Sequence, residues 1–179
     1  METFICEKGC CIVKVNPYNV PKDPLDKVRK KRRKAGVFIF DPIENRVLLV
    51  QSRGHLWGPP KGTLNYAETE RKCAIREVKE ETGLIISEDD FTRSTCIHNR
   101  AIYFFSERKA CDISIQDHIP DNDANGITWI KPECLTSCIE NGNISLSKHC
   151  RIVFYRFMGM IFPHSAFVLI EKKGQSARF

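Results

Sequence analysis

The chain has 179 residues, a net charge of +6 and a hydrophobic content of 42%, which is typical of one globular domain large enough to bury its own core. It has no apolar run of about 18 residues, so we expect no transmembrane span and no membrane partner. The first residues, METFICEKGCC, lack the basic and apolar regions of a signal peptide.

Nine cysteines are present, and an odd number without a secretory signal indicates reduced thiols in a cytoplasmic protein. Cys10 and Cys11 are adjacent, and Cys134 and Cys138 lie four residues apart on a predicted helix. Neither spacing comes with a matching CxxC pair or a histidine cluster, so the sequence does not favour a zinc site. We expect several cysteines to be small core residues.

Positive charge is concentrated near the N-terminus, where residues 1–34 hold ten Lys/Arg and four Asp/Glu, whereas the rest of the chain holds eighteen of each. We therefore divide the chain into a basic arm, residues 1–33, and a domain, residues 34–179. Most of this charge lies in the basic run KVRKKRRK, residues 27–34. The basic run fits a solvated helix start or a nuclear-import signal, and it equally fits a platform for RNA or an inositol polyphosphate. Its candidate polyanion-binding residues are Lys27, Arg29, Lys30, Lys31, Arg32, Arg33 and Lys34.

The first predicted strand, residues 11–15, is followed by a proline-containing irregular connection. The segments AGVFIFD, residues 35–41, and RVLLVQS, residues 46–52, predict two strands that form a hairpin. Two prolines in HLWGPPKG then exclude a helix and stiffen the approach to Gly62.

A helix of about four turns is predicted next, within residues 62–84. Thr69 is a suitable N-cap and Gly83 a suitable C-terminal stop. Three residues provide an apolar face toward the core: Ala74, Ile75 and Val78.

The same helix carries Glu77, Glu80 and Glu81 at positions i, i+3 and i+4, so these carboxylates project from one face. Three like charges on one turn repel one another. One interpretation is a solvated acidic surface relieved by Arg76 and Lys79. The other is a cation site, and the helix alone does not separate the two.

After this helix, alternating and apolar segments predict further strands, and a polar loop is expected over residues 118–126. The aromatic residues of the last helix are expected to lie in the core or at an interface. This order predicts an α/β protein with a mixed sheet. The expected strands are residues 91–98, 101–106, 111–115 and 127–130, the expected helices are residues 133–140 and 147–160, and the tail, residues 164–179, can hold one more strand.

The spacing of Gly62, Glu68, Arg76-Glu77, Val78, Glu80-Glu81, Gly83 and Leu84 resembles the box that defines the Nudix hydrolases, at all seven fixed and both apolar positions. The resemblance implies an α/β/α sandwich and an enzyme that cleaves a nucleoside diphosphate linked to another group. It covers about residues 34–129.

The resemblance also implies roles for the box residues. Mg²⁺ or Mn²⁺ would be bound by the Gly62 carbonyl, Glu77, Glu80 and Glu81, and Arg76 would orient the glutamates. Glu68 is either an outer ligand or a partner of its own loop. The general base is Glu80 or Glu81 acting through water, or Asp123, which precedes Trp129 by six residues.

Substrate-binding candidates lie around the box. Lys61 and Arg53 would face phosphate, and Trp57, Tyr103 or Phe105 would stack on a nucleobase. For Tyr103 and Phe105 a place in the core is the favoured interpretation, whereas Trp57, in a loop next to the site, fits either role. The segment WGPPKG resembles the mRNA-decapping and diadenosine tetraphosphate hydrolase branches, and less closely the diphosphoinositol polyphosphate phosphohydrolases.

The leading functional hypothesis is therefore removal of the 5′ cap from mRNA, with release of methylated guanosine diphosphate. The partner would be capped RNA or another nucleotide, and the location would be the cytoplasm, with the nucleus as the alternative. The 33 residues before the domain leave no room for the helical domain of cellular decapping enzymes, but compact relatives of large DNA viruses would fit, with the host cytoplasm as the location. The alternatives are hydrolysis of diadenosine or diphosphoinositol polyphosphates, and an inactive nucleotide- or RNA-binding module. The oligomeric state stays open.

Overall fold

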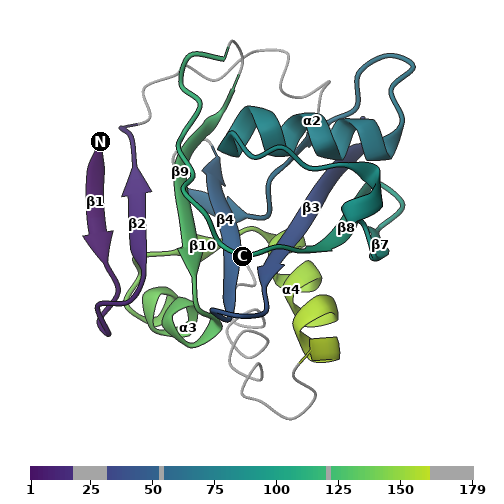
Figure 1. Ribbon diagram of the computed structural model, residues 1–179. Coiled ribbons are helices and arrows are strands. Elements are labelled where there is room, and N and C mark those ends of the chain that lie inside the picture. The colour runs from purple at the N-terminus through teal and green to yellow at the C-terminus, as the bar shows by residue number, and fades with distance from the viewer. Residues whose placement is uncertain (18–31, 53–54, 120–121, 162–179) are drawn as a thin grey trace, which may run out of the picture.

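The computed structural model describes residues 1–17, 32–52, 55–119 and 122–161, and at its centre lies one mixed β-sheet with helices on both faces (Figure 1). Three short strands pair with members of this sheet: β5 (Leu56–Gly58), β6 (Lys61–Thr63) and β10 (Ser145–Leu146). In spatial order its main strands are β1 (Glu2–Ile5), β2 (Ile12–Val15), β9 (Ala124–Ile130), β4 (Arg46–Ser52), β3 (Lys34–Asp41), β8 (Ala101–Glu107) and β7 (Arg93–Ile97).

The strand directions confirm the expected mixed sheet. β3 and β4 form the predicted antiparallel hairpin, whereas β3 and β8 run parallel. No helix in the described part of the chain is long and apolar enough to cross a membrane. The helical elements are α2 (Glu70–Thr82), the short 3₁₀ helix η1 (Glu88–Asp90), α3 (Pro132–Glu140) and α4 (Lys148–Ile161).

Successive side chains of β3 point into two different cores, as the two-residue period of a strand requires. Val37 and Ile39 belong to the core that includes residues of α2. Phe38 and Phe40 belong to the core that includes residues of α3 and α4. The sheet is therefore the middle layer of an α/β/α sandwich, which confirms the expected fold class (Figure 1).

Aromatic packing holds α4 on the second face of the sheet. The Phe38 ring lies 5.1 Å from the Phe154 ring and 5.4 Å from the Phe157 ring, measured between centroids. The Phe105 ring lies 5.1 Å from Phe157. Phe154 and Phe157 of the last predicted helix thus belong to the core, one of the two places that the sequence indicated, whereas Tyr155 is exposed.

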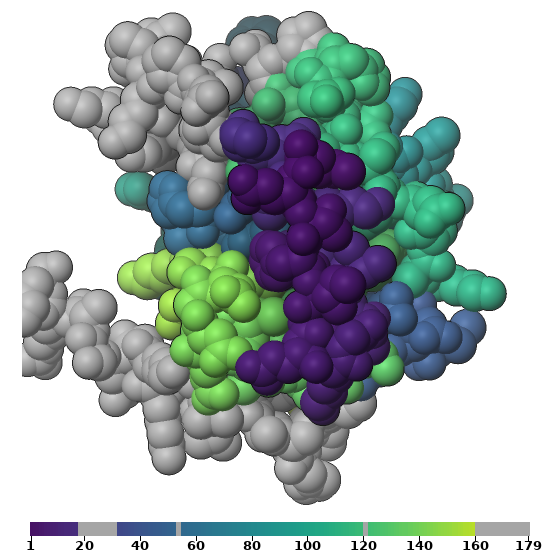
Figure 2. Space-filling model, turned by 90° about the vertical axis from the view of Figure 1, so that its left-hand side faces the viewer, coloured from purple at the N-terminus to yellow at the C-terminus, as the bar shows by residue number. Residues whose placement is uncertain are grey.

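The N-terminal residues differ from the expected arm. The sequence predicts β2, as residues 11–15, but it does not predict β1. The two strands form a hairpin, and β2 pairs with β9 and so joins the hairpin to the sheet. Figure 2, which views this edge, shows the N-terminal residues packed against later parts of the chain. Residues 2–15 therefore belong to the sheet, while residues 18–31, which hold much of the basic run, lie outside the described residues.

The predicted strand over residues 111–115 was wrong, because this segment forms no strand. Its apolar residues Ile113 and Ile115 pack against the α2-side core from a loop, and Trp129 donates a hydrogen bond from Nε1 to the Cys111 carbonyl at 3.0 Å. Apolar alternation here reflects packing of a loop. The loop expected over residues 118–126 is shorter, since β9 begins at Ala124, and the expected tail strand lies outside the described residues.

Candidate active site

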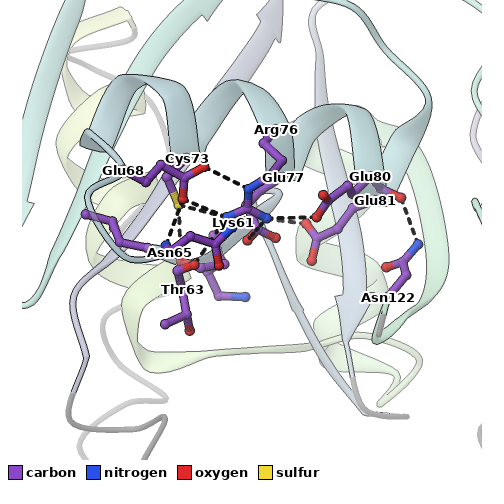
Figure 3. A network of polar contacts seen from close by, with 12 residues as sticks. Lys61, Thr63, Asn65, Glu68, Cys73, Arg76, Glu77, Glu80, Glu81 and Asn122 are labelled. Atoms are coloured by element: carbon purple, nitrogen blue, oxygen red, sulfur yellow. Dashed lines mark hydrogen bonds and ion pairs between the residues drawn. The ribbon is translucent and has the colours of Figure 1, made fainter. Parts of the chain in front are cut away.

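The loop from β6 into α2 brings the candidate residues together (Figure 3). The Thr69 hydroxyl oxygen accepts a hydrogen bond from the Lys72 N–H at 3.3 Å, so Thr69 is the N-cap of α2. Gly83 ends the helix with φ 77°, and its N–H donates to the Lys79 carbonyl at 2.9 Å. Both predicted ends of the helix are confirmed, and β6 is fixed beside the helix because it pairs with β3.

The Arg76 guanidinium lies at the centre of the polar network in Figure 3. It donates to both carboxylate oxygens of Glu68, at 2.8 and 2.9 Å. Its Nη1 donates to Glu77 and to Glu80, each at 2.8 Å. Its Nη2 also donates to the Thr63 carbonyl at 3.2 Å. One cation thus neutralises carboxylates that would otherwise repel one another, and it joins α2 to the preceding loop.

Glu68 is held as a partner of its own loop. Besides Arg76, it accepts a hydrogen bond from the Asn65 N–H at 2.9 Å. The hydrogen bonds from Arg76 are the main reason why the pKa of Glu68 lies below its ordinary value. Of the two roles left open by the sequence, this geometry favours the loop partner over the outer ligand.

Glu81 occupies a different environment, with only 2% of its surface exposed. One of its oxygens accepts a hydrogen bond from the Lys61 backbone N–H at 2.8 Å. Burial raises the pKa of Glu81 well above its ordinary value; the Lys61 charge opposes this rise, and the charges of Glu77 and Asp123 add to it. A buried carboxylate of this kind is costly for the metal-free fold and is suited to binding a cation.

Gly62 lies in direct contact with the Glu77 carboxylate. A Cβ atom at position 62 would fall 1.9 Å from the Glu77 carboxyl carbon and from one of its oxygens. A glycine is therefore required here, since any side chain would displace Glu77. Burial raises the pKa of Glu77, and the charge and hydrogen bond of Arg76 oppose that rise.

The three glutamates have the donor atoms that a hard divalent cation needs. Arg76 contacts one oxygen each of Glu77 and Glu80, and Lys61 contacts one oxygen of Glu81. Within the described residues, the second oxygen of each carboxylate has no hydrogen-bonding protein partner. Carboxylate oxygens and a nearby carbonyl are ligands that Mg²⁺ and Mn²⁺ prefer, so this donor set fits the expected ion.

Asp123 lies close enough to this cluster for its charge to raise the pKa of both Glu77 and Glu81. Its neighbour Asn122 was missed by the sequence analysis. The Asn122 side-chain amide donates to the Glu80 carbonyl at 2.8 Å and to the Gln116 carbonyl at 2.9 Å, which ties the loop before β9 to the end of α2 (Figure 3). No spacing in the sequence indicates this contact, because Asn122 belongs to no motif.

Of the two roles weighed for the aromatic candidates, stacking on a base and a place in the core, the structure shows the core. Trp57 and Tyr103 are each 1% exposed and Phe105 is 3% exposed, and all three lie in the core beneath α3 and α4. A ring surrounded by core side chains cannot serve as a platform for a base. The alternating pattern of β8 identified the face of Tyr103 and Phe105, but α4 covers that face.

The structure describes some of the cationic candidate residues and not others. Burial lowers the pKa of His149, and the positive charge of Lys61 adds to this effect. The same charge opposes the rise in the pKa of Glu81, so the half-buried Lys61 side chain lies beside the acidic cluster. Arg32 donates to the Leu64 carbonyl, and Arg33 forms an ion pair with Glu70 at 2.6 Å. Lys34 is the first residue of β3. The candidates outside the described residues are Lys27, Arg29, Lys30, Lys31 and Arg53.

Comparison with known families agrees with this geometry. The model of the family described as "NUDIX domain" matches residues 30–147, which is more than half of the chain. The chain therefore belongs to the Nudix family, and it is a hydrolase that acts on pyrophosphate bonds.

The relatives include viral and cellular proteins. The protein named "Putative hydrolase 111R" of Invertebrate iridescent virus 3 is 36% identical over 138 residues, which are 75% of this chain and 80% of that protein. The m7GpppN-mRNA hydrolase dcap-2 of Caenorhabditis elegans is 51% identical over 51 residues, 27% of this chain and 6% of that protein. The mRNA-decapping enzyme subunit 2 of Arabidopsis thaliana is 43% identical over 53 residues, 29% of this chain and 14% of that protein. The matches to these two enzymes thus cover a small part of their length.

Among solved structures, the Nudix domain of Shewanella oneidensis NrtR, crystallised with ADP ribose, superposes with a TM-score of 0.55. Its sequence identity is 16%, and the match covers 78% of this chain and 93% of that one. At this identity the likeness shows the fold alone.

The first prediction concerns Gly62. We expect Gly62→Ala to lower the turnover number by on the order of 100-fold, because the new Cβ displaces the Glu77 carboxylate from its position. Gly159→Ala in α4 is the matched control, since a Cβ there meets no atom within 4 Å. Steady-state kinetics and melting temperatures of both variants check this. Wild-type turnover in a folded Gly62→Ala protein would show that the close approach of the Gly62 backbone to the Glu77 carboxylate is not needed.

The second prediction concerns the cost of burying Glu81. In metal-free protein at pH 7, we expect Glu81→Gln to raise the melting temperature by about 2–6 °C. The folded-state pKa of Glu81 is raised, whereas a glutamate in the unfolded chain has a pKa of about 4.3. As the pH rises, the unfolded chain therefore loses this proton at a lower pH than the folded protein does. Glu81 therefore lowers stability as the pH rises above that value, and the gain from Glu81→Gln should vanish near about pH 4.

Thermal unfolding across this pH range checks the Glu81 prediction. Glu107→Gln, which neutralises an exposed carboxylate on β8, is the control and should leave the melting temperature nearly unchanged. A loss of stability in Glu81→Gln at pH 7 would show that the buried charge stabilises the fold.

Proposed function

We propose that this Nudix hydrolase removes the 5′ cap of mRNA and releases methylated guanosine diphosphate. The observation that carries this proposal is the local similarity to two decapping enzymes, at 51% and 43% identity over segments of 51 and 53 residues. The WGPPKG segment before the Nudix box supports the same branch. The similarity to a viral protein supports the host cytoplasm as the place of action.

Mg²⁺ or Mn²⁺ would be held by Glu77, Glu80, Glu81 and the Gly62 carbonyl. When bound, such an ion neutralises phosphate oxygens and lowers the pKa of a coordinated water. The contact between Gly62 and Glu77 supports this assignment, because it brings the Gly62 backbone and a carboxylate of the ligand set close together.

The remaining polar groups act on the ligands and on the substrate. Arg76 positions Glu77 and Glu80, and Glu68 holds Arg76 and the loop in place. Proton removal from the attacking water falls to a carboxylate of this cluster, Glu80, Glu81 or Asp123. Lys61, beside Glu81, would meet a substrate phosphate as a point charge.

The basic run would bind the RNA body of the substrate. Arg32 and Arg33 lie against the loop and the start of α2 that carry the ligand set, through Leu64 and Glu70. The other cations of the basic run, which precede Arg32 in the chain, would bind further phosphates of the same RNA. A small nucleotide would contact few of them, so the run favours a longer polyanion.

The alternative enzyme function is hydrolysis of diadenosine or diphosphoinositol polyphosphates, which the WGPPKG segment also allows. The third hypothesis, an inactive binding module, is disfavoured by the intact ligand set. A module without catalysis would not need to bury Glu81 or to keep Gly62 against Glu77.

The third prediction separates these functions. With Mn²⁺ present, we expect the protein to release methylated guanosine diphosphate from cap-labelled RNA, and to cleave diadenosine tetraphosphate and a diphosphoinositol polyphosphate far more slowly. The turnover of Glu80→Gln should be lower by on the order of 100-fold or more on every substrate, because a metal ligand is lost. Chromatography of the labelled products is the measurement.

Turnover of the small substrates alone would contradict decapping and favour the alternative. Turnover of none of them by the wild-type protein would contradict both enzyme functions for these substrates. Equal activity in Glu80→Gln would point to a contaminating hydrolase.

The fourth prediction tests the basic run. We expect Lys30→Gln combined with Lys31→Gln to weaken RNA binding and to reduce its logarithmic salt slope by up to about 1.4 for single-stranded RNA, since two phosphate contacts are lost. Hydrolysis of a small substrate should stay unchanged. Lys109→Gln, at an exposed position after β8, controls for net charge. An unchanged salt slope, measured by fluorescence anisotropy, would show that these lysines do not contact RNA.

A further inference from the structure

Four cysteine sulfurs meet between the N-terminal hairpin and α3. Cys6, Cys10 and Cys11 lie in or beside the turn between β1 and β2, and Cys134 lies on α3. Their Sγ atoms all lie within 4.8 Å of one another. In Figure 1 the turn between β1 and β2 is beside α3 and far from α2. This cluster is therefore separate from the site built on the Nudix box.

The distances are those of a tetrahedral metal site. With a Zn–S bond of about 2.3 Å, a tetrahedron places its sulfur atoms about 3.8 Å apart. The Sγ of Cys10 lies 3.7 Å from that of Cys6, 3.6 Å from that of Cys11 and 3.4 Å from that of Cys134. Small side-chain adjustments would bring all four sulfurs to bonding distance from one ion.

The turn has the backbone arrangement that such a site needs. The Cys6 N–H donates to the Cys11 carbonyl at 3.0 Å, and the Gly9 N–H donates to the Cys6 carbonyl at 2.8 Å, which folds the turn back on itself. Gly9 has φ 69°, a conformation that suits glycine.

Backbone amides also point at the sulfurs. The Cys11 N–H donates to Cys6 Sγ at 3.3 Å, and the Lys131 N–H donates to Cys11 Sγ at 3.4 Å. Hydrogen bonds of this kind favour the charged thiolate and orient the ligand.

Burial and hydrogen bonds act on the pKa values of three of these thiols. Burial would raise the pKa of Cys6, but backbone and thiol hydrogen bonds outweigh it and hold that pKa at about 6. Burial raises the pKa of Cys11 to about 11 and that of Cys134 further.

We propose that Cys6, Cys10, Cys11 and Cys134 bind one structural Zn²⁺ ion as a closed tetrathiolate site. Soft thiolates select Zn²⁺ over Mg²⁺ and Mn²⁺, which the oxygen ligands of α2 suit. Binding is not a redox step: each thiol loses a proton, and four Zn–S bonds form. The ion joins the β1–β2 hairpin to α3 and so fixes the hairpin at the edge of the sheet, where β2 pairs with β9. The sequence spacing did not indicate the site, because its fourth ligand comes 123 residues after Cys11.

Zinc content of the full-length protein tests this proposal. The wild-type protein, purified under reducing conditions without chelators, should contain about one zinc per chain by mass spectrometry of the metal. Cys134→Ala should lose it. Cys138→Ala should keep it, because Cys138 is buried one turn further along α3 but is not one of the four. Glu80→Gln should also keep it, which separates this ion from the site on α2.

Two further measurements keep the test independent of misfolding in Cys134→Ala. Cys10→Ala removes the most exposed ligand of the four and should fold but bind no zinc. Cobalt substituted into the wild-type protein should give the visible absorption bands of a tetrahedral tetrathiolate. A zinc-selective chelator should lower the melting temperature of the wild-type protein and leave that of Cys10→Ala unchanged.

Three results would overturn the proposal. The first is wild-type protein with reduced thiols and no zinc after supplementation. The second is equal zinc content in wild type and Cys10→Ala. The third is a Cys10–Cys134 disulfide in freshly isolated protein, found by peptide mapping without reductant, which would mark the cluster as a redox pair.

Discussion

The candidate active site depends on the Arg76 guanidinium. This single cation donates hydrogen bonds to Glu68, Glu77 and Glu80, and it also reaches the Thr63 carbonyl. The same set of carboxylates without it would be a cluster of like charges on a partly buried helix face. Charge-assisted hydrogen bonds of this kind contribute roughly 1.5–3 kcal/mol each, and removing the cation would leave buried negative charge without a partner.

The fold holds this network on rigid elements. β6 pairs with β3, so the loop that carries Gly62 and Glu68 starts from a strand fixed in the sheet. α2 lies against the same sheet through Cys73, Ala74 and Val78, which are fully buried. This packing also holds α2 against β6 and the loop, so that Glu77 meets Gly62 and Glu81 meets the Lys61 N–H. The buried charge of Glu81 opposes stability, and the packing of α2 offsets this cost.

Local features of this site could be read from the sequence because they arise within one helix and its caps. Thr69, Gly83 and the spacing of the three glutamates are fixed by helix geometry, and the structure confirms the helix between Glu70 and Thr82. The two aromatic residues Tyr103 and Phe105 were placed on the correct strand. Their burial depends on α4, which packs on them from more than 40 residues later in the chain, and a period of two does not say which face is covered.

Long-range contacts were the part that the sequence could not provide. Asn122 holds the end of α2 through a backbone carbonyl, which carries no residue signature. Cys134 meets the N-terminal cysteines only because β2 pairs with β9 and α3 follows β9 directly. The segment 111–115 alternates like a strand but is a loop whose apolar residues fill a gap beside α2.

Manganese binding to Arg76→Lys tests the central role of the guanidinium most directly. Lysine keeps the charge but cannot reproduce the forked contacts to Glu68, Glu77 and Glu80. The expected result, measured by electron paramagnetic resonance of free Mn²⁺, is an affinity lower by at least about tenfold in a protein with an unchanged circular dichroism spectrum. An unchanged Mn²⁺ affinity would contradict the conclusion that Arg76 organises the ligand set.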